Sequence, residues 1–225
     1  MKKSINRLSQ FLTAVIKNSP HLTDPRVIQA MSEVDRALFV PPHLQSAAYD
    51  TSVISLDGYT LSEPGLVGYM IQSLDLHPSD IVLDIGSGSG YHAAVMSRLC
   101  HAVYGVEVLP HAVERSRVAL RAALCPNVEI RCGDGWDGWD AHAPYDAVNV
   151  ACATDHLPPA ILAQMKTGGR MIIPLGARDP LGREPQQLSL VTKQGAAPLD
   201  DESLPPLSRQ VLTPVFFVPM VHIHH

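Results

Sequence analysis

The sequence predicts an α/β fold, in which helices cover both faces of a mostly parallel, doubly wound sheet. Residues 81–85 read Ile-Val-Leu-Asp-Ile, a short apolar run that is typical of a strand buried on both faces. Glycines at alternate positions, Gly86, Gly88 and Gly90, then end the strand, because they permit the sharp turn that leads into a helix near Tyr91. Strands and helices alternate from there to residue 174, which is the order of elements in a doubly wound sheet.

Helices are also expected before this strand. Apolar residues recur at helical spacing over 5–17, and a second helix is expected after Asp24 and Pro25, which suit the N-cap and the first turn. The two helices would form a cap over the sheet edge or the substrate side, because they have no sheet of their own on which to bury their apolar stripes. A short β-like run at 51–56, a loop at 57–64 and a helix at 65–74 follow.

The rest of the chain supplies the other strands of the sheet. A strand at 102–106 ends at Glu107, and the helix after it opens with Pro110 and runs to about residue 124. Strands are also expected at 128–131, 146–151 and 170–174, with a helix at 157–165 that Gly168 and Gly169 cap. A C-terminal strand pair at 187–192 and 211–220 completes the sheet. We expect a single domain over 1–225, with the helical cap and a substrate loop at 1–60 and the catalytic core at 61–225.

The glycine loop differs from the loop that binds dinucleotides. That loop needs a third small residue where Tyr91 stands here, because its helix packs closely against the strand and faces a pyrophosphate. Glu107, at the tip of the next strand, is placed to accept hydrogen bonds from both ribose hydroxyls of an adenosine. The pattern predicts an adenosine ligand without a pyrophosphate, and the alternative is a glycine turn beside an incidental surface glutamate.

Composition and charge argue against several classes of protein. The 225 residues carry a net charge of −5 with no basic block, so binding to nucleic acid through phosphates is not expected. The four cysteines form no CxxC pair, which predicts reduced, mostly buried thiols and neither a metal nor a redox site. No stretch approaches the roughly 20 apolar residues that cross a bilayer, and the first residues lack the apolar region of a signal peptide. We therefore expect a cytoplasmic location, and we assign no function to the terminal His222, His224 and His225.

The glycine loop resembles motif I of the class I S-adenosylmethionine (SAM) methyltransferases, whose fold is a Rossmann-like sheet. From about residue 34 to residue 220 the chain is similar to one family of them, the protein-L-isoaspartate O-methyltransferases. The most specific parts of the resemblance are the Thr-Leu-Ser-Glu-Pro segment at 60–64 and the Phe-Val-Pro-Met run at 217–220. Other matching segments are Arg36 with 39–41, and the runs at 133–139, 143–147 and 168–176.

The resemblance implies a site for SAM and for an acceptor carboxylate. Ser62 corresponds to the family's active-site serine, whose hydroxyl contacts the reacting carboxylate, and its alternative role is that of a turn or N-cap residue before Pro64. A carboxylate is ionised at neutral pH and is already a nucleophile, so it needs placement rather than a strong base. The residues implied in SAM binding are Tyr59, Thr60, Leu61, Asp84, Gly86, Ser87, Gly88, Gly90, Glu107, Val108, Asp134 and Gly135.

The sequence departs from the family pattern at the expected acceptor side. Tyr59 stands where the family usually has glutamine, and Glu63 would repel a carboxylate substrate unless its side chain points away. After the strand at 146–151 the family usually reads Ala-Ala-Pro-Pro or similar, whereas residues 151–156 here read Ala-Cys-Ala-Thr-Asp-His. We interpret Asp155 and His156 as helix caps, with new acceptor contacts as the alternative.

These features predict a SAM-dependent O-methyltransferase that methylates L-isoaspartyl carboxylates of damaged proteins or peptides, acting as a monomer. The first alternative is the same scaffold respecialised for a carboxylate or hydroxyl of a peptide or small metabolite. A second alternative is a SAM-binding regulatory protein without turnover. An amino N-methyltransferase is disfavoured, because residues 151–154 lack the Pro-Pro-aromatic motif that grips an amino group.

Overall fold

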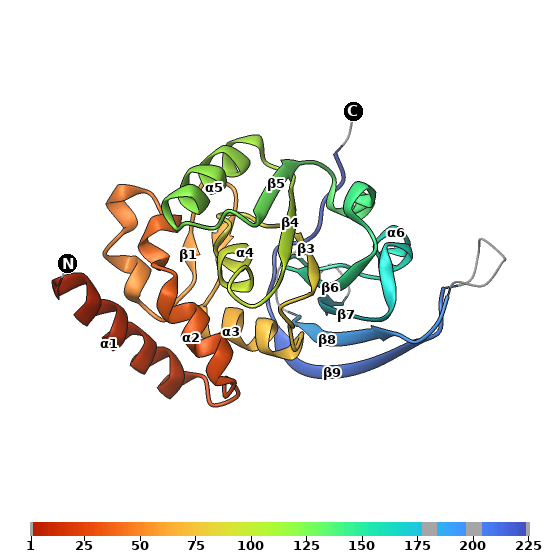
Figure 1. Ribbon diagram of the computed structural model, residues 1–225, viewed down its shortest axis with the longest axis horizontal. Helices are drawn as coiled ribbons and strands as arrows, with labels where there is room; N and C mark the ends of the chain where they lie inside the picture. The colour runs from red at the N-terminus through yellow and green to blue at the C-terminus, as the bar shows by residue number, and fades with distance from the viewer. Residues whose placement is uncertain (1, 177–183, 197–203, 224–225) are drawn as a thin grey trace.

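The computed structural model describes residues 2–176, 184–196 and 204–223, with side chains described from residue 7. Its central element is a seven-stranded sheet in the order β5-β4-β3-β6-β7-β8-β9 (Figure 1). The strands are β3 (Ile81–Ile85), β4 (Ala102–Glu107), β5 (Val128–Cys132), β6 (Tyr145–Val150), β7 (Met165–Leu175), β8 (Gln186–Lys193) and β9 (Leu207–Val215). Strands β3 to β7 are parallel to one another, and β8 and β9 form the antiparallel C-terminal pair. The predicted fold class is confirmed.

Helices lie on both faces of this sheet. They are α1 (Lys2–Asn18), α2 (Pro25–Glu33), α3 (Pro64–Ser73), α4 (Tyr91–Met96), α5 (Pro110–Ala122) and α6 (Pro159–Ala163). Alternate residues of β3 belong to different cores, since Val82 packs in the cluster that contains α3, α4 and α5, whereas Leu83 and Ile85 pack in the cluster that contains α6. A strand covered on both sides has no polar face, which explains its continuous apolar run.

The N-terminal helices pack on other helices rather than directly on the sheet. Helices α1 and α2 contact α3, and α2 also contacts α4, so the two lie at one side of the molecule, away from β8 and β9 (Figure 1). Phe11 and Val15 of α1 and Met31 of α2 are buried in the larger core cluster. Asp24 is the N-cap of α2, because its carboxylate accepts a hydrogen bond of 2.8 Å from the Arg26 amide.

The predicted glycine cap of the sixth helix is wrong. Helix α6 ends at Ala163, and Gly168 and Gly169 lie inside strand β7. The register of β6 against β7 shifts there: Tyr145 pairs with Met165, but Ala147 pairs with Arg170. The chain between these pairs bulges outward, and Gly168 takes a positive φ of 81°, which glycine adopts without strain.

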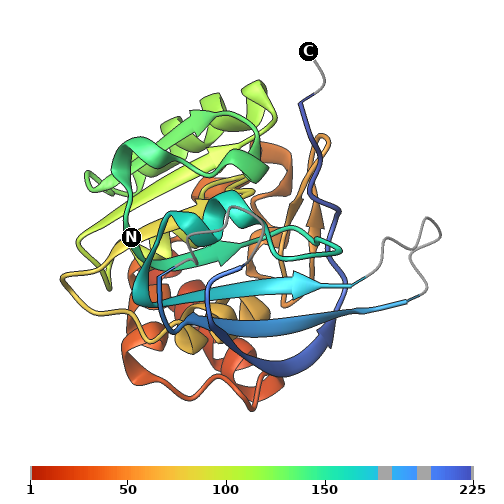
Figure 2. The ribbon, with the colours of Figure 1, turned by 90° about the vertical axis from the view of Figure 1, so that its right-hand side faces the viewer.

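The last strand is also shorter than predicted. Strand β9 starts at Leu207 and ends at Val215, so residues 216–220 do not extend the sheet as the prediction of 211–220 required. Instead the chain turns away from β9 and runs past the ends of the central strands (Figure 2). The backbone amide of Met220 donates to the carbonyl of Ala153 at 2.8 Å, which holds this segment beside the end of β6.

Short elements connect α2 to α3. They are the 3-10 helices η1 (Arg36–Phe39), η2 (Pro42–Leu44) and η3 (Ala47–Tyr49), and a two-stranded antiparallel sheet of β1 (Ile54–Ser55) and β2 (Thr60–Leu61). Two more 3-10 helices, η4 (Gly135–Asp137) and η5 (Asp140–His142), precede β6. Strand β2 lies directly before α3, which places residues 59–62 near the ends of the central strands.

Candidate active site

The order of the strands places a crevice at the carboxyl end of β3. The chain proceeds from β3 through β4 to β5 on one side of the sheet and returns to β6 on the other side of β3. Loops after β3 and β6 therefore diverge, and ligands of doubly wound folds bind at such a point. Asn149 of β6 donates a hydrogen bond of 2.7 Å to the fully buried Asp84 of β3, which joins the two halves of the sheet below the crevice.

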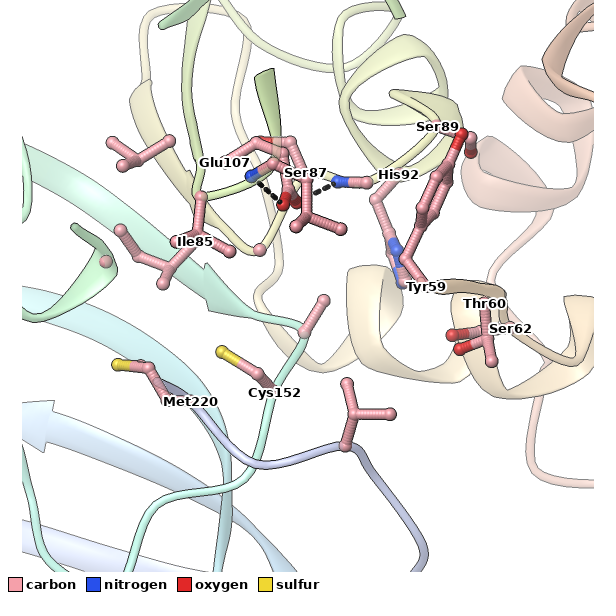
Figure 3. A pocket seen from close by; sticks show the side chains of 18 of the residues that line it. Tyr59, Thr60, Ser62, Ile85, Ser87, Ser89, His92, Glu107, Cys152 and Met220 are labelled. Carbon is pink, nitrogen blue, oxygen red and sulfur yellow. Dashed lines mark hydrogen bonds between the residues drawn. The ribbon is translucent and has the colours of Figure 1, made fainter. Parts of the chain in front are cut away.

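A cavity of about 300 Å³ occupies this crevice (Figure 3). Its walls come from six places in the chain: the segment around β2, the loop after β3 with the start of α4, the tip of β4, the loops after β5 and after β6, and the C-terminal segment. Predicted site residues that line it are Tyr59, Thr60, Leu61, Ser62, Gly86, Ser87, Gly88, Glu107, Val108 and Gly135. The tertiary structure thus brings together residues that stand far apart in the sequence.

Glu107 is held in place at the tip of β4. Its side chain is buried, and its two carboxylate oxygens each accept one backbone hydrogen bond, from Gly88 at 2.8 Å and from Leu109 at 2.9 Å (Figure 3). A carboxylate has about four lone-pair positions, so each oxygen keeps capacity for another donor. The carboxylate lines the cavity and is available for two hydroxyl groups.

The glycine loop adopts the backbone conformation that its sequence predicts. Gly86, Gly88 and Gly90 have φ values of 73°, 50° and 86°, which side chains with a Cβ rarely adopt. A Cβ on Gly88 would also lie 3.3 Å from the ring of Tyr59. Gly90 is the N-cap residue of α4 and lies beneath the loop rather than at the cavity wall, which Gly86 and Gly88 form.

Ser62 lines the cavity directly after β2, and its backbone carbonyl accepts a hydrogen bond from Arg36. The fully buried Arg36 donates hydrogen bonds to the carbonyls of Ser62, Ser52 and Asp50, at 2.9, 3.3 and 3.5 Å. Because one guanidinium binds all three carbonyls, it connects the loop before β1 to the residue that follows β2. Burial lowers the pKa of Arg36, and the nearby Tyr91, Glu63 and Asp50 oppose this shift.

Glu63 does not face the cavity. It is the N-cap of α3, and its carboxylate accepts hydrogen bonds from the amides of Gly65 at 2.8 Å and Leu66 at 2.6 Å. Glu63 takes the N-cap position that we allowed for Ser62 as an alternative, so the Ser62 hydroxyl is not needed there. The negative charge that we expected near the acceptor is directed to the helix N-terminus, where it is favourable.

The interpretation of Asp155 and His156 as helix caps is wrong. Helix α6 begins at Pro159, and its N-cap is Pro158, which makes no side-chain cap. Asp155 and His156 are exposed and pair with each other at 2.5 Å, and the imidazole stacks on Trp136 with ring centroids 4.9 Å apart. Proline at the first position, Pro159, removes one of the free amides at this helix N-terminus.

The C-terminal segment contacts Asp134. Its carboxylate accepts hydrogen bonds from the amides of Trp136 at 2.9 Å and Ile223 at 3.0 Å, and it lies 3.2 Å from Nδ1 of His222. Burial acts to raise the pKa of Asp134, but these hydrogen bonds outweigh it and the pKa is lowered. Asp134 is thus directed to its own loop, and its neighbour Gly135 forms the cavity wall. His222 takes part in this contact, although we assigned it no function, and His224 and His225 lie outside the described residues.

Asp84 lies below the cavity rather than in its wall. Its pKa is raised to about 6, chiefly by burial, while hydrogen bonds from Asn149 and Ser87 oppose the shift. The hydroxyl of Ser87 donates to the Asp84 carbonyl at 2.9 Å, so Asp84 supports the glycine loop from beneath.

Two groups of cavity residues were missed in the sequence. The segment from Val218 to Val221 lines the cavity, although it was expected to be a strand; its Val-Pro-Met motif marked it as special but not as part of a site. Tyr91 and His92, in the first turn of α4, also line the cavity. Polar atoms just after a glycine loop are a usable signal, because the first turn of such a helix faces the ligand.

The residues present suit the binding of SAM. Glu107 offers a buried carboxylate with spare acceptor capacity, and Gly86 and Gly88 leave space for a ligand against the backbone. The hydroxyl of Tyr91 and Nε2 of His92 are buried and have no hydrogen-bond partner within the described ranges. Buried polar atoms are usually satisfied, and both residues line the cavity, so the unpaired atoms are consistent with a polar ligand there.

A doubly wound sheet whose glycine loop is followed by Tyr91 rather than by a third small residue, with an acid on the next strand in the same cavity, fits the class I SAM-dependent methyltransferases. The model of the family described as Protein-L-isoaspartate(D-aspartate) O-methyltransferase (PCMT) matches residues 7–224. Accordingly, the chain belongs to the protein-L-isoaspartate O-methyltransferase family, and it is a SAM-dependent O-methyltransferase that modifies carboxyl groups.

Individual relatives agree with this assignment. Protein-L-isoaspartate O-methyltransferase 1 of Cupriavidus necator is 41% identical over 217 residues, which cover 94% of this chain and 77% of the relative. Protein-L-isoaspartate O-methyltransferase 2 of Polaromonas sp. is 40% identical over 198 residues, or 88% of each chain.

Solved structures share the fold. A protein-L-isoaspartate O-methyltransferase structure aligns with a TM-score of 0.78 and 27% identity, over 94% of this chain and 65% of that chain. Thus the present chain spans just under two thirds of that solved protein. A second structure, from Plasmodium falciparum and in complex with S-adenosyl-L-homocysteine, aligns with a TM-score of 0.76 and 20% identity, over 97% of this chain and 98% of that chain.

Proposed function

We propose that this protein methylates L-isoaspartyl carboxylates of damaged proteins or peptides, with Ser62 as the residue that contacts the acceptor. The observation that carries this proposal is that Ser62, directly after β2, and Glu107, at the end of β4, line the same cavity. A group that orients a carboxylate and a group that holds a ribose thus belong to one site. Family membership supports the acceptor class, and the cavity supports the roles of the residues.

In this proposal Glu107 binds the ribose of SAM, and the loop formed by Gly86, Ser87 and Gly88 lies against the cofactor. Tyr59, Thr60 and Leu61 form the opposite wall of the cavity, along the methionine part of SAM. Val108 and Gly135 line the adenosine end, while Asp84, Gly90 and Asp134 act by shaping the loops from outside the cavity wall.

SAM supplies a methyl group on a positively charged sulfur, and its transfer to a carboxylate oxygen leaves S-adenosylhomocysteine and a methyl ester with no proton released. The residues of this chain therefore need no strong base. Ser62 donates a hydrogen bond to the acceptor carboxylate and holds one oxygen in line for transfer. Arg36 fixes the backbone of Ser62, and Glu63, bound to α3, does not repel the acceptor.

The proposal also covers the oligomeric state, the location and the domain organisation of the protein. We propose that the chain acts as a monomer in the cytoplasm, and that residues 1–225 form one domain with a cap at 1–60 and a catalytic core at 61–225. The four cysteines are unpaired, which is consistent with a reducing compartment. Of the helices in the described part of the chain, none has both the length and the apolar content that crossing a membrane requires.

A second candidate is a respecialised acceptor on the same scaffold. Tyr59 favours it, because an aromatic ring lines the cavity where the family pattern usually has glutamine. The ring would narrow the acceptor side and select a different carboxylate or a hydroxyl of a peptide or small metabolite.

The test is transfer of labelled methyl from SAM to matched peptides that carry either an isoaspartyl residue or a normal aspartate. We expect transfer to the isoaspartyl peptide alone. If neither peptide is methylated although S-adenosylhomocysteine binds, the acceptor is a different one, or the protein binds SAM without turnover. Absence of S-adenosylhomocysteine binding would contradict the assignment of the cavity itself.

A further inference from the structure

His92 is a cavity residue without an assigned role. It lies in the first turn of α4, directly after the glycine loop, and its residue is only 7% exposed. Its Nε2 atom is buried and forms no hydrogen bond within the described ranges of the chain. In Figure 3 the imidazole points from α4 toward the segment that contains Tyr59, Thr60 and Ser62, and all four residues line the same cavity.

The imidazole is uncharged in this position. Burial, and secondarily the positive charge of Arg36, lowers the pKa of His92 to about 4. A neutral imidazole carries one N–H donor and one acceptor nitrogen. Leaving either of them buried without a partner is unfavourable, so an unpaired nitrogen at a cavity wall indicates a ligand atom within reach.

The charges around His92 favour an anionic ligand. Arg36 is fully buried, and its hydrogen bonds go to the uncharged carbonyls of Asp50, Ser52 and Ser62. The positive charge of Arg36 acts on His92 and also on Tyr91, whose buried hydroxyl has no hydrogen-bond partner within the described ranges and is also close enough to Asp35 to be affected by its negative charge. A neutral donor beside a buried cation is a suitable environment for a carboxylate.

We propose that His92 binds a carboxylate in this cavity, with its Nε2–H group as the hydrogen-bond donor. The inference rests on the proposed function, which supplies two carboxylates: that of the methionine part of SAM and that of the acceptor. In that function Tyr59, Thr60 and Leu61 lie along the methionine part of SAM and Ser62 contacts the acceptor, so both carboxylates belong to the end of the cavity that residues 59–62 form. His92 is therefore a binding residue for the methyl-transfer reaction, additional to Ser62 and Glu107.

Three substitutions separate the donor from the bulk of the side chain. His92→Leu removes the nitrogen atoms but fills the site, His92→Gln can place an amide N–H near the position of Nε2, and His92→Asn can do so only near Nδ1. For each variant the thermal midpoint, the Kd for S-adenosylhomocysteine and the KM for an isoaspartyl peptide at saturating SAM are measured. A hydrogen bond to a charged group contributes enough for a loss of about tenfold or more.

The two sources of the carboxylate give different results. If His92 binds the carboxylate of SAM, then His92→Leu weakens S-adenosylhomocysteine binding about tenfold and leaves the peptide KM within twofold. If it binds the acceptor, the peptide KM rises about tenfold at unchanged affinity for S-adenosylhomocysteine. In either case His92→Gln restores most of the loss and His92→Asn does not. Wild-type values for His92→Leu in both assays would overturn the proposal.

A measurement on the unmodified protein covers the case in which the variants fail to fold. The ¹⁵N shift of Nε2, assigned through correlations between the imidazole and the backbone of residue 92 in the wild type, is followed during titration with S-adenosylhomocysteine and then with isoaspartyl peptide. We expect a shift in one of the two titrations, and no shift in either would also overturn the proposal. Failure of methyl transfer by the wild type would instead contradict the proposed function, and the titration with S-adenosylhomocysteine would still test His92.

Discussion

The guanidinium of Arg36 donates a hydrogen bond of 2.9 Å to the backbone carbonyl of Ser62, and it is fully buried when it does so. The same group binds the carbonyls of Ser52 and Asp50. A side chain from η1 thus sets the position of the residue that we propose to contact the acceptor.

Arg36→Lys should lower kcat about tenfold or more and should also lower the thermal midpoint. Lysine keeps the charge, but its single ammonium cannot reach three carbonyls in the way that a planar guanidinium does. The measurement is kcat at saturating substrates, well below the thermal midpoint of the variant, with the exposed Arg121→Lys as control. An unchanged kcat would show that Ser62 does not need this support.

Ser62→Ala should leave the Kd for S-adenosylhomocysteine within twofold of the wild type and should lower kcat by about 10- to 150-fold. The fold-change corresponds to a hydrogen bond to a charged group, about 1.5–3 kcal/mol. Calorimetry and labelled methyl transfer give the two quantities, and the exposed Ser55→Ala serves as the matched control. Normal turnover in Ser62→Ala would exclude Ser62 from contact with the acceptor.

Glu107→Ala should weaken the binding of S-adenosylhomocysteine by about tenfold or more. It removes the acceptor that we assign to the ribose and also frees the amides of Gly88 and Leu109, each a cost of about 1–3 kcal/mol when unsatisfied. Glu114→Ala, on the exposed face of α5, is the control. Equal affinity in the two variants would mean that the ribose lies elsewhere.

Glu63→Gln should reduce the free energy of unfolding by about 0.5–1 kcal/mol and should not improve the peptide KM. The carboxylate caps two amides of α3, and an amide side chain is an uncharged and poorer cap at a helix N-terminus. Denaturant unfolding and steady-state kinetics measure the two effects. A KM several-fold lower than that of the wild type would indicate that Glu63 repels the acceptor after all.

Acid should destabilise the wild type more than His92→Gln. The folded-state pKa of His92 is about 4, below the ordinary histidine pKa of 6.5, so between these values the unfolded chain binds the proton and the folded protein does not. The free energy of unfolding therefore falls as the pH falls through this window, by about 2 kcal/mol between pH 7 and pH 5. Urea titrations at the two pH values measure the difference.

The comparison of His92→Gln with the wild type isolates this effect. Asp84, whose pKa is raised to about 6, acts in the opposite direction, because its folded form binds the extra proton. Asp84 is present in both proteins, so its contribution cancels in the difference. Parallel stability profiles for the two proteins would contradict the assignment of a lowered pKa to His92.

Local sequence was sufficient to predict the central strands, and to predict the glycine loop and Glu107 in the site. The run at 81–85 and the glycines after it predict β3 and its loop, because burial on both faces and positive φ each restrict the residues allowed. Glu107 could be assigned to the tip of β4 because parallel strands end at the same edge of the sheet. Asp24 and Pro25 predicted the start of α2, since capping depends only on neighbouring residues.

Other features of the fold and the site could not be predicted from neighbouring residues alone. The Gly168-Gly169 pair has the composition of a helix cap, but it forms a bulge in β7 because the register against β6 requires extra residues there. Residues 216–220 have the composition of a strand, yet they leave the sheet, and Val218, Pro219 and Met220 line the cavity. Glu63 and Asp155 are both acids close to a helix that opens with proline, and only the first is a cap, because only its carboxylate lies within reach of free amides.

The sequence by itself determined the order of strands and helices, the glycine loop with its acid on the next strand, and the membership of a methyltransferase family. These depend on periodicity, on backbone freedom and on spacing, all of which are properties of neighbouring residues. Only the tertiary structure decided that Arg36 holds Ser62, that Glu63 turns away, and that His92 has an unpaired nitrogen in the cavity. Each of these depends on where distant segments meet in space, because burial and hydrogen-bond partners are set by packing rather than by the local sequence.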